Sequence, residues 1–140
     1  MALLVPNVGE ERMLRLITHT TTAASTNGNL MLRLYKTDVT PTSTQTLVDY
    51  TEATFTGYAA TECTSGSWTI TAGAPSDATQ SSATTFTCGA ATSESIYGYF
   101  LTQQDSSVLM WAEKFSDGPY VLTNDGDKII LTAAVTLSTT

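Results

Sequence analysis

Basic residues are scarce in this chain of 140 residues. Six lysines and arginines stand against thirteen acidic residues, so the formal net charge at pH 7 is -7. Proteins that bind a nucleic acid backbone or an anionic membrane surface generally present a patch of lysine and arginine. The charge balance therefore argues against nucleic acid and against a membrane as partners.

Long apolar runs are also missing. No segment of the sequence approaches the roughly 20 apolar residues that a helix needs to cross a bilayer. Residues 1–6 hold a very short apolar run with no basic residue ahead of it, which differs from a secretory signal. We therefore expect a soluble protein that folds in a cytosol.

Cysteine is limited to Cys63 and Cys88, and His19 is the single histidine. One disulfide would require an oxidising compartment and Cα atoms within about 7 Å of each other. Two buried thiols are the expected alternative in a cytosolic protein. Two cysteines and one histidine without close spacing do not match a zinc site, so we expect no metal and no cofactor.

Threonine and serine occupy the places that charged residues take in most proteins. Hydrophobic residues make up 41% of the chain and charged residues 14%, well below the charged quarter that is typical of globular domains. Threonine is β-branched and suits a half-exposed strand better than a helix. A chain of this length and composition indicates a single all-β domain.

A helix is expected only near the N-terminus. Residues 7–17 begin with a capping-box-like Asn7 to Glu10 and place apolar side chains at helical spacing. We interpret residues 1–18 as an N-terminal arm with this short helix, and residues 19–140 as the β domain. The apolar residues of the arm are candidates for contact with a shell or with another subunit: Leu3, Leu4, Val5, Met13, Leu14, Leu16 and Ile17.

The remainder of the sequence alternates between strand-like and turn-like segments. Turn residues recur about every eight to twelve positions, the spacing of a β-sandwich or barrel. Residues 73–82 are rich in glycine, proline, serine and aspartate and are predicted to be a connection. The fold expected is an antiparallel β-sandwich, jelly-roll-like, with strands near 30–35, 68–71, 84–88, 96–102, 108–115, 120–122 and 128–137.

Sequence motifs for catalysis are weak. His19 lies in a threonine run and is not part of any nucleophile or base motif. Asp125 and Asp127 flank Gly126 like a fragment of a calcium loop, but the terminal glutamate of such a loop is absent, so a hairpin turn is the preferred interpretation. A hydrolase that uses two of the carboxylates Glu52, Glu62, Glu94 and Glu113 is a remote alternative, because nothing sets their separation.

Strand alternation aligns a carboxylate with apolar side chains near residue 111. Glu113 shares a predicted strand face with Leu109, Trp111 and Phe115. If this face is buried, Glu113 needs a partner, and Arg33 is the candidate. If it is exposed, Trp111 and Phe115 form an aromatic contact surface, to which Tyr58 is a further candidate. A third alternative places Glu113 at the rim of the sheet.

Several segments taken together resemble small virion structural proteins of tailed bacteriophages. The resemblance spans nearly the whole chain and rests on VPNVGE at 5–10, LRLYK at 32–36, YTEATFTGYA at 50–59, YGYF at 97–100 and WAEKF at 111–115. The two cysteines and the long threonine–serine middle are not part of the pattern. The matching residues are mostly aromatic, glycine and turn positions, so they indicate a fold before a site.

The resemblance implies a binding role without catalysis. Such proteins look like small β-sandwich subunits that decorate or cement the outer capsid surface, or that form part of a tail or head appendage. The expected partners are then the major capsid protein and other copies of this chain, with a homotrimer favoured, in a virion assembled in the bacterial cytoplasm. The alternative function is a tail or head fibre module that binds a host surface glycan.

Overall fold

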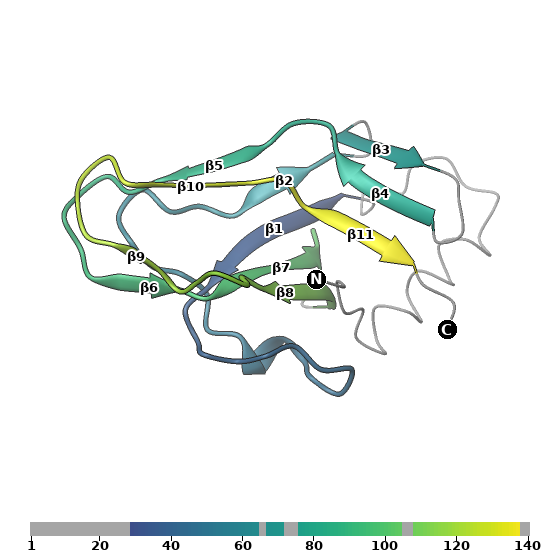
Figure 1. Ribbon diagram of the computed structural model, residues 1–140, viewed down its shortest axis with the longest axis horizontal. Coiled ribbons are helices and arrows are strands. Elements are labelled where there is room, and N and C mark those ends of the chain that lie inside the picture. Colours follow the sequence, from purple (N-terminus) through teal and green to yellow (C-terminus); the bar gives the residue numbers. More distant parts are fainter. Residues whose placement is uncertain (1–28, 65–66, 72–75, 105–107, 138–140) are drawn as a thin grey trace.

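The computed structural model describes residues 29–64, 67–71, 76–104 and 108–137 (Figure 1). These residues form strands joined by loops and contain one short 3-10 helix. The elements in chain order are β1 Leu30–Tyr35, η1 Leu47–Asp49, β2 Thr61–Cys63, β3 Trp68–Thr71, β4 Ser76–Gln80, β5 Thr84–Thr87, β6 Glu94–Ile96, β7 Gly98–Gln103, β8 Leu109–Lys114, β9 Tyr120–Leu122, β10 Lys128–Leu131 and β11 Ala134–Leu137.

All of the strand pairs are antiparallel. The largest sheet has the order β2-β1-β7-β8, and three smaller sheets have the orders β11-β4-β3, β10-β5 and β6-β9. This confirms the all-β antiparallel class expected from the sequence. The predicted arm and helix, residues 1–18, lie outside the described residues. No helix among the described residues is long and apolar enough to cross a membrane.

Successive strands continue one another across short breaks. Tyr97 alone separates β6 from β7, whereas residues 115–119 separate β8 from β9 on the facing strand. The β7–β8 ladder ends at the pair Gly98 and Lys114, and the β6–β9 ladder ends at the pair Ile96 and Tyr120. The single residue Tyr97 therefore lies opposite the five residues 115–119. Residues 115–119 therefore bulge from the edge of the paired strands, just before Tyr120.

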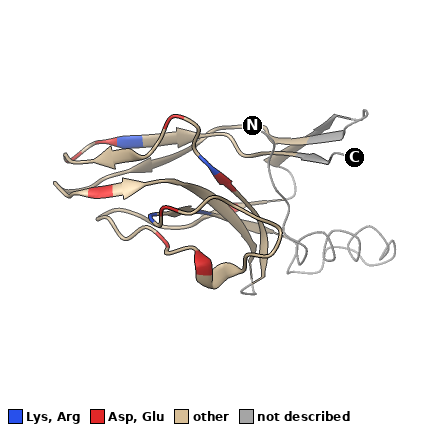
Figure 2. Cartoon of the chain, turned by 60° about the horizontal axis from the view of Figure 1, so that its bottom comes forward, with Lys and Arg blue, Asp and Glu red and all other residues tan. Residues whose placement is uncertain are grey.

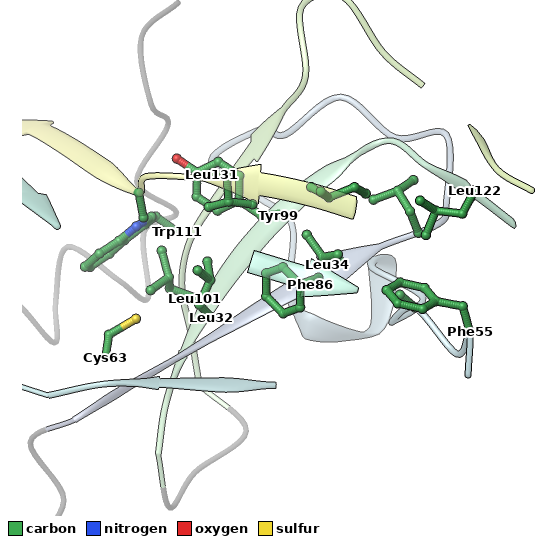
Figure 3. Close-up of a cluster of buried hydrophobic side chains, with 14 of the residues drawn as sticks. Leu32, Leu34, Phe55, Cys63, Phe86, Tyr99, Leu101, Trp111, Leu122 and Leu131 are labelled. Atoms are coloured by element: carbon green, nitrogen blue, oxygen red, sulfur yellow. The ribbon is translucent and has the colours of Figure 1, made fainter. Parts of the chain in front are cut away.

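The main core lies between the four-stranded sheet and the strands β5, β10 and β11. Leu32, Leu34 and Leu101 extend from the sheet toward Phe86 and Leu131 on the other side (Figure 3). Each of these side chains is at most 9% exposed. At about 25 cal/mol per Å² of buried apolar surface, packing of this kind is the main source of stability for such a domain.

A second, smaller core covers the opposite face of the same sheet. Tyr35, Phe100 and Leu109 face this side, and Tyr50 and Leu47 from the loop after β1 pack against them. The rings of Tyr35 and Tyr50 meet edge to face at 5.1 Å, a favoured aromatic geometry. The segment around η1 is thereby held against the sheet, as Figure 1 shows below β1.

Two predicted segments differ in the structure. Residues 73–82, expected to be a connection, contain β4, which is paired on one side by β3 and on the other by β11. The predicted strand at 128–137 divides into β10 and β11, and the buried Gln80 accepts a hydrogen bond from the backbone N–H of Ala133 at the break. The polar residues of β4 resemble those of a turn, which explains the prediction. Hydrogen bonding to β3 and β11 on its two sides nevertheless makes this segment a strand.

The two cysteines are buried free thiols, which is the alternative to a disulfide that the sequence left open. The Gln80 side-chain amide donates to the Cys63 sulfur at 3.0 Å, and the Cys88 thiol donates to the carbonyl of Ala90 at 2.9 Å. Burial raises the pKa of the Cys63 thiol, so this sulfur is held in its protonated, poorly nucleophilic form.

Candidate functional site

Arg33 and Glu113 do not form the pair predicted from the sequence. Arg33 is opposite Phe100 in the β1–β7 ladder, on the face of the smaller core. Glu113 is opposite Tyr99, whose side chain belongs to the main core. The two side chains extend from opposite faces of one sheet, so the predicted contact is wrong.

The partner of Arg33 is Glu52. One guanidinium nitrogen contacts both carboxylate oxygens of Glu52, at 2.8 and 3.0 Å. The Tyr58 hydroxyl donates to the same carboxylate at 2.7 Å and accepts from the backbone N–H of Leu34 at 3.1 Å. Burial, followed by the hydrogen bond to Glu52, raises the pKa of Tyr58. This cluster connects the loop after β1 to the sheet.

Glu113 is satisfied from its own face of the sheet. The hydroxyl of Tyr99, directly opposite in the β7–β8 ladder, donates to the Glu113 carboxylate. Burial raises the pKa of Tyr99, and the hydrogen bond to Glu113 raises it further. A carboxylate on this face does have a partner, as predicted, but the partner is Tyr99 and not Arg33.

A third polar cluster joins the loop to β6. The Glu94 carboxylate accepts from the backbone N–H of Thr54 at 2.7 Å and from its hydroxyl at 2.9 Å, and it contacts the Lys36 ammonium at 3.4 Å. Burial alone would raise the pKa of Glu94, but the hydrogen bonds from Thr54 and the charge of Lys36 lower it overall.

The predicted hydrolytic carboxylates are divided among separate contacts. Glu52 binds Arg33, Glu94 binds Thr54, and Glu113 binds Tyr99. Glu62 accepts a hydrogen bond from the Asn29 side chain. Each carboxylate thus has a local structural partner, and the arrangement offers no support for the hydrolase alternative. His19 lies outside the described residues.

The Asn124–Asp127 segment is a turn, as expected, but it is not a hairpin turn, because β9 before it pairs with β6 and β10 after it pairs with β5. The Asp127 carboxylate accepts from the backbone N–H groups of Thr123 and Asn124, both at 2.8 Å, and these hydrogen bonds lower the pKa of Asp127. Gly126 has φ of +87°, which favours glycine. Within the described part of the chain, no three His, Cys, Asp or Glu side chains are placed to hold a metal ion.

Two of the three predicted aromatic contact residues, Trp111 and Tyr58, pack against the core of the domain. Trp111 is 5% exposed and meets Trp68 edge to face at 6.2 Å, so the prediction of a contact surface at Trp111 is wrong. Tyr58 is half-buried, stacks on Phe86 and directs its hydroxyl to Glu52. Phe115 is the exception, because it packs on the main core and also lines an open groove.

This groove, which we call the β10 groove, is lined by Phe115, Tyr120, Lys128, Ile129 and Ile130. It is about 410 Å³ in volume and lies where the segment from β8 to β9 faces β10. The rings of Phe115 and Tyr120 meet at 5.1 Å, and Tyr99 continues the aromatic row at 6.2 Å from Phe115. A hydrogen bond to Asp117 raises the pKa of Tyr120.

Two large apolar side chains that line the β10 groove, Tyr120 and Ile130, are exposed, and the exposed Val121 follows Tyr120 on the opposite face of β9. Tyr120 is 39% exposed, Val121 53% and Ile130 63%. Among the described residues the fourth large exposed hydrophobic is Val48, on η1. Basic and acidic residues, by contrast, are interspersed along the strands and loops (Figure 2).

The sequence contained a signal for this surface that our prediction did not use. Ile129, Ile130 and Leu131 form an unbroken apolar run, although alternate residues of a strand face opposite ways. Ile129 and Leu131 are buried, so Ile130 is directed outward. An apolar residue at the outward position of a strand indicated an exposed patch.

The predicted arm residues Leu3, Leu4, Val5, Met13, Leu14, Leu16 and Ile17 lie outside the described residues, and their role stays a prediction.

Comparison of the chain with protein-family models, with curated proteins and with solved structures gives no match.

Proposed function

We propose that this protein is a non-catalytic virion structural protein that binds the outer capsid surface as a decoration or cement protein and stabilises the shell. The proposal takes its virion setting from the sequence resemblance. The observation that carries it in the structure is the exposed apolar surface of Tyr120 and Ile130 at the β10 groove. Apolar patches of this kind usually mark sites of protein contact.

The order of the strands supports a β-sandwich as the finer description of the fold. Core side chains come from the four-stranded sheet on one side and from β5, β10 and β11 on the other. The chain passes between these two groups of strands after β2, after β5 and after β9. We propose a sandwich with jelly-roll-like connections, which would present loops at both ends to neighbouring proteins.

A homotrimer seated over junctions between major capsid proteins is the assembly we propose. A trimer matches the three-fold symmetry of such junctions, and contacts of modest affinity gain strength when linked copies bind together. The apolar arm residues, Leu3 to Val5 and Met13 to Ile17, are the proposed shell or subunit contacts. Binding to the intact shell stabilises it by mass action.

The test is reconstitution on capsid shells that lack the protein. Purified full-length chain is mixed with such shells, and saturable binding is measured by sedimentation together with the temperature at which particles rupture. Stoichiometric binding with a raised rupture temperature is the expected result. Absence of binding at saturating protein overturns the decoration role.

A glycan-binding fibre module is the second candidate function. The observation that favours it is the Phe115–Tyr120 ring pair at the β10 groove, since exposed aromatic rings stack on sugar faces. A glycan array probed with the full chain and with the Tyr120→Ala variant tests this function. Tyr120-dependent binding to a host surface glycan, without shell binding, would favour the fibre module.

A further inference from the structure

The β10 groove follows the backbone edge of a strand. Its lining includes Lys128, Ile129 and Ile130, three consecutive residues of β10. Consecutive side chains of a strand alternate between its two faces, so a groove lined by all three must run along the strand's edge. Among the described strands, β10 pairs only with β5, which leaves the other edge open to this groove.

The register shows which main-chain groups reach the open edge. The Cys88 N–H donates to the Asp127 carbonyl at 2.8 Å, which makes that pair a hydrogen-bonded one in the β5–β10 register. Hydrogen-bonded and non-hydrogen-bonded pairs alternate along an antiparallel ladder. The N–H and C=O groups of Ile129 and Leu131 therefore face β5, and those of Lys128 and Ile130 face the groove.

The lining of the groove is apolar apart from Lys128, and acidic residues lie near Tyr120 and before the start of β10. Phe115 and Tyr120 face β10 across the opening, and Ile129 is buried at its base. Asp117 lies near the Tyr120 hydroxyl on one wall and raises its pKa. Asp125 and Asp127 lie in the turn that leads into β10. A complementary ligand is apolar where it meets Phe115, Tyr120 and Ile129 and carries positive charge where it approaches these acidic residues.

We propose that the β10 groove binds an extended segment of a partner protein, which adds to β10 as a new strand. Main-chain hydrogen bonds to Lys128 and Ile130 give affinity in this mode, and side-chain pockets on alternate positions give specificity. The segment has apolar residues facing Phe115 and Ile129 and basic residues at its ends. Its assignment to the major capsid protein rests on the proposed function, whereas strand addition does not.

Another copy of this chain is a poorer occupant than a basic-ended partner. Each copy has a net charge of -7, so two acidic surfaces would be brought together at the groove. The Lys128 side chain at the edge also opposes pairing with a second, identical β10, because lysine on an edge strand discourages edge-to-edge contact. The groove thus favours a segment of opposite charge.

Amide hydrogen exchange on the full chain tests the open edge directly. In the free protein we expect fast exchange at Lys128 and Ile130 and slow exchange at Ile129 and Leu131. The probe is a synthetic peptide, Lys-Val-Thr-Val-Thr-Val-Lys, added in excess, and it should slow exchange at Lys128 and Ile130 by at least about tenfold. The same peptide with every internal backbone nitrogen methylated cannot pair through either edge and should give no protection.

Two proline variants provide a matched test of the groove edge. Ile130→Pro removes an N–H that faces the groove. Thr85 is the cross-strand partner of Ile130, and Thr85→Pro removes an N–H that faces away from β10. Proline is tolerated where the lost N–H is not part of a ladder. We expect Ile130→Pro to weaken peptide binding by up to about tenfold and Thr85→Pro to leave it unchanged.

The remaining variant covers the case in which Ile130→Pro does not fold. Tyr120→Ala opens one wall without touching the β5–β10 ladder and should also weaken peptide binding. Strand addition is overturned if the Ile130 amide exchanges slowly in the free protein. It is also overturned if every folded groove variant binds the peptide as tightly as wild type. A hexose that binds at Tyr120 without protecting the Ile130 amide overturns it as well.

Shell binding separates this inference from the proposed function. If wild-type protein binds shells and Tyr120→Ala binds them equally well, the assignment of the groove's partner segment to the major capsid protein fails and the decoration role stands. If wild-type protein binds no shells but the peptide protects Lys128 and Ile130, strand addition stands and the decoration role fails.

Discussion

The loop over the four-stranded sheet and the open edge at β10 are both surface regions, yet they use their side chains differently. In the loop, Glu52 binds Arg33 and Tyr58, and Thr54 binds Glu94. At the β10 groove, Tyr120 and Ile130 have large exposed apolar areas. A surface whose groups are paired internally stabilises the fold, whereas an exposed apolar surface lowers its free energy by binding something else.

The two regions differ in backbone pairing as well. The loop is joined to the sheet by Lys36 N–H to Thr51 O and Ala53 N–H to Leu34 O bonds of 2.8 and 2.9 Å. The groove edge of β10 has no ladder among the described strands. Variants that affect the loop should therefore change stability, and variants at the groove should change binding.

The largest expected effect is the loss of the loop's aromatic anchor. Tyr50→Ala removes a buried ring that packs on Tyr35 and Phe100, and we expect the free energy of unfolding to fall by about 3–5 kcal/mol. Tyr120→Ala, the matched change at the groove, should cost less than about 1 kcal/mol because its ring is partly exposed. Urea unfolding followed by circular dichroism measures both, and equal losses would contradict the contrast.

A single hydroxyl gives the next largest effect. Tyr58→Phe leaves the Leu34 N–H without its acceptor and removes one of the two donors to Glu52, so we expect a loss of about 1–3 kcal/mol. Tyr120→Phe removes a hydroxyl at the surface and should change the free energy of unfolding by less than about 0.5 kcal/mol. If the two variants unfold at the same urea concentration, the Tyr58 network does not stabilise the loop.

The fold was predictable from the sequence where local pattern and burial agree. Leu30 to Tyr35 alternates, and β1 has the predicted bounds. The β4 strand has no such pattern, since its pairing with β3 and β11 depends on residues distant in sequence. Leu109 also departs from simple alternation, because a register shift in the β7–β8 ladder between Leu101 and Thr102 directs it to the smaller core while Trp111 faces the main one.

The site was less predictable than the fold for a related reason. Alternation correctly placed Glu113 with Trp111, but the partner of a carboxylate depends on which strand lies opposite and in what register. Tyr99 is that residue, and Arg33 is on the other face. The β10 groove depends on the bulge of residues 115–119, for which the sequence shows only a Gly-Pro turn.

A pH-dependent effect should appear in the loop clusters. Because the folded-state pKa of Glu94 is lowered, its ionised form stabilises the protein above the unfolded value of 4.5, and this contribution is lost as the pH falls through the folded pKa. Glu94→Gln should therefore be less stable than wild type at pH 7, by less than about 1 kcal/mol. The difference should shrink toward pH 3, as measured by urea unfolding; a difference independent of pH would point to lost packing.

The smallest expected effect on stability compares the exposed apolar residues themselves. Ile130→Thr and Val48→Thr both replace an exposed β-branched residue, 63% and 91% accessible, with a polar one of the same branching. Each should change the free energy of unfolding by less than about 0.5 kcal/mol. If the β10 edge is the docking surface, Ile130→Thr should weaken shell binding in the sedimentation assay while Val48→Thr should not. If both variants bind shells equally well, Ile130 contributes no more to shell binding than Val48 does, and the docking surface does not include the β10 edge. The apolar arm residues would then be the next surface to substitute.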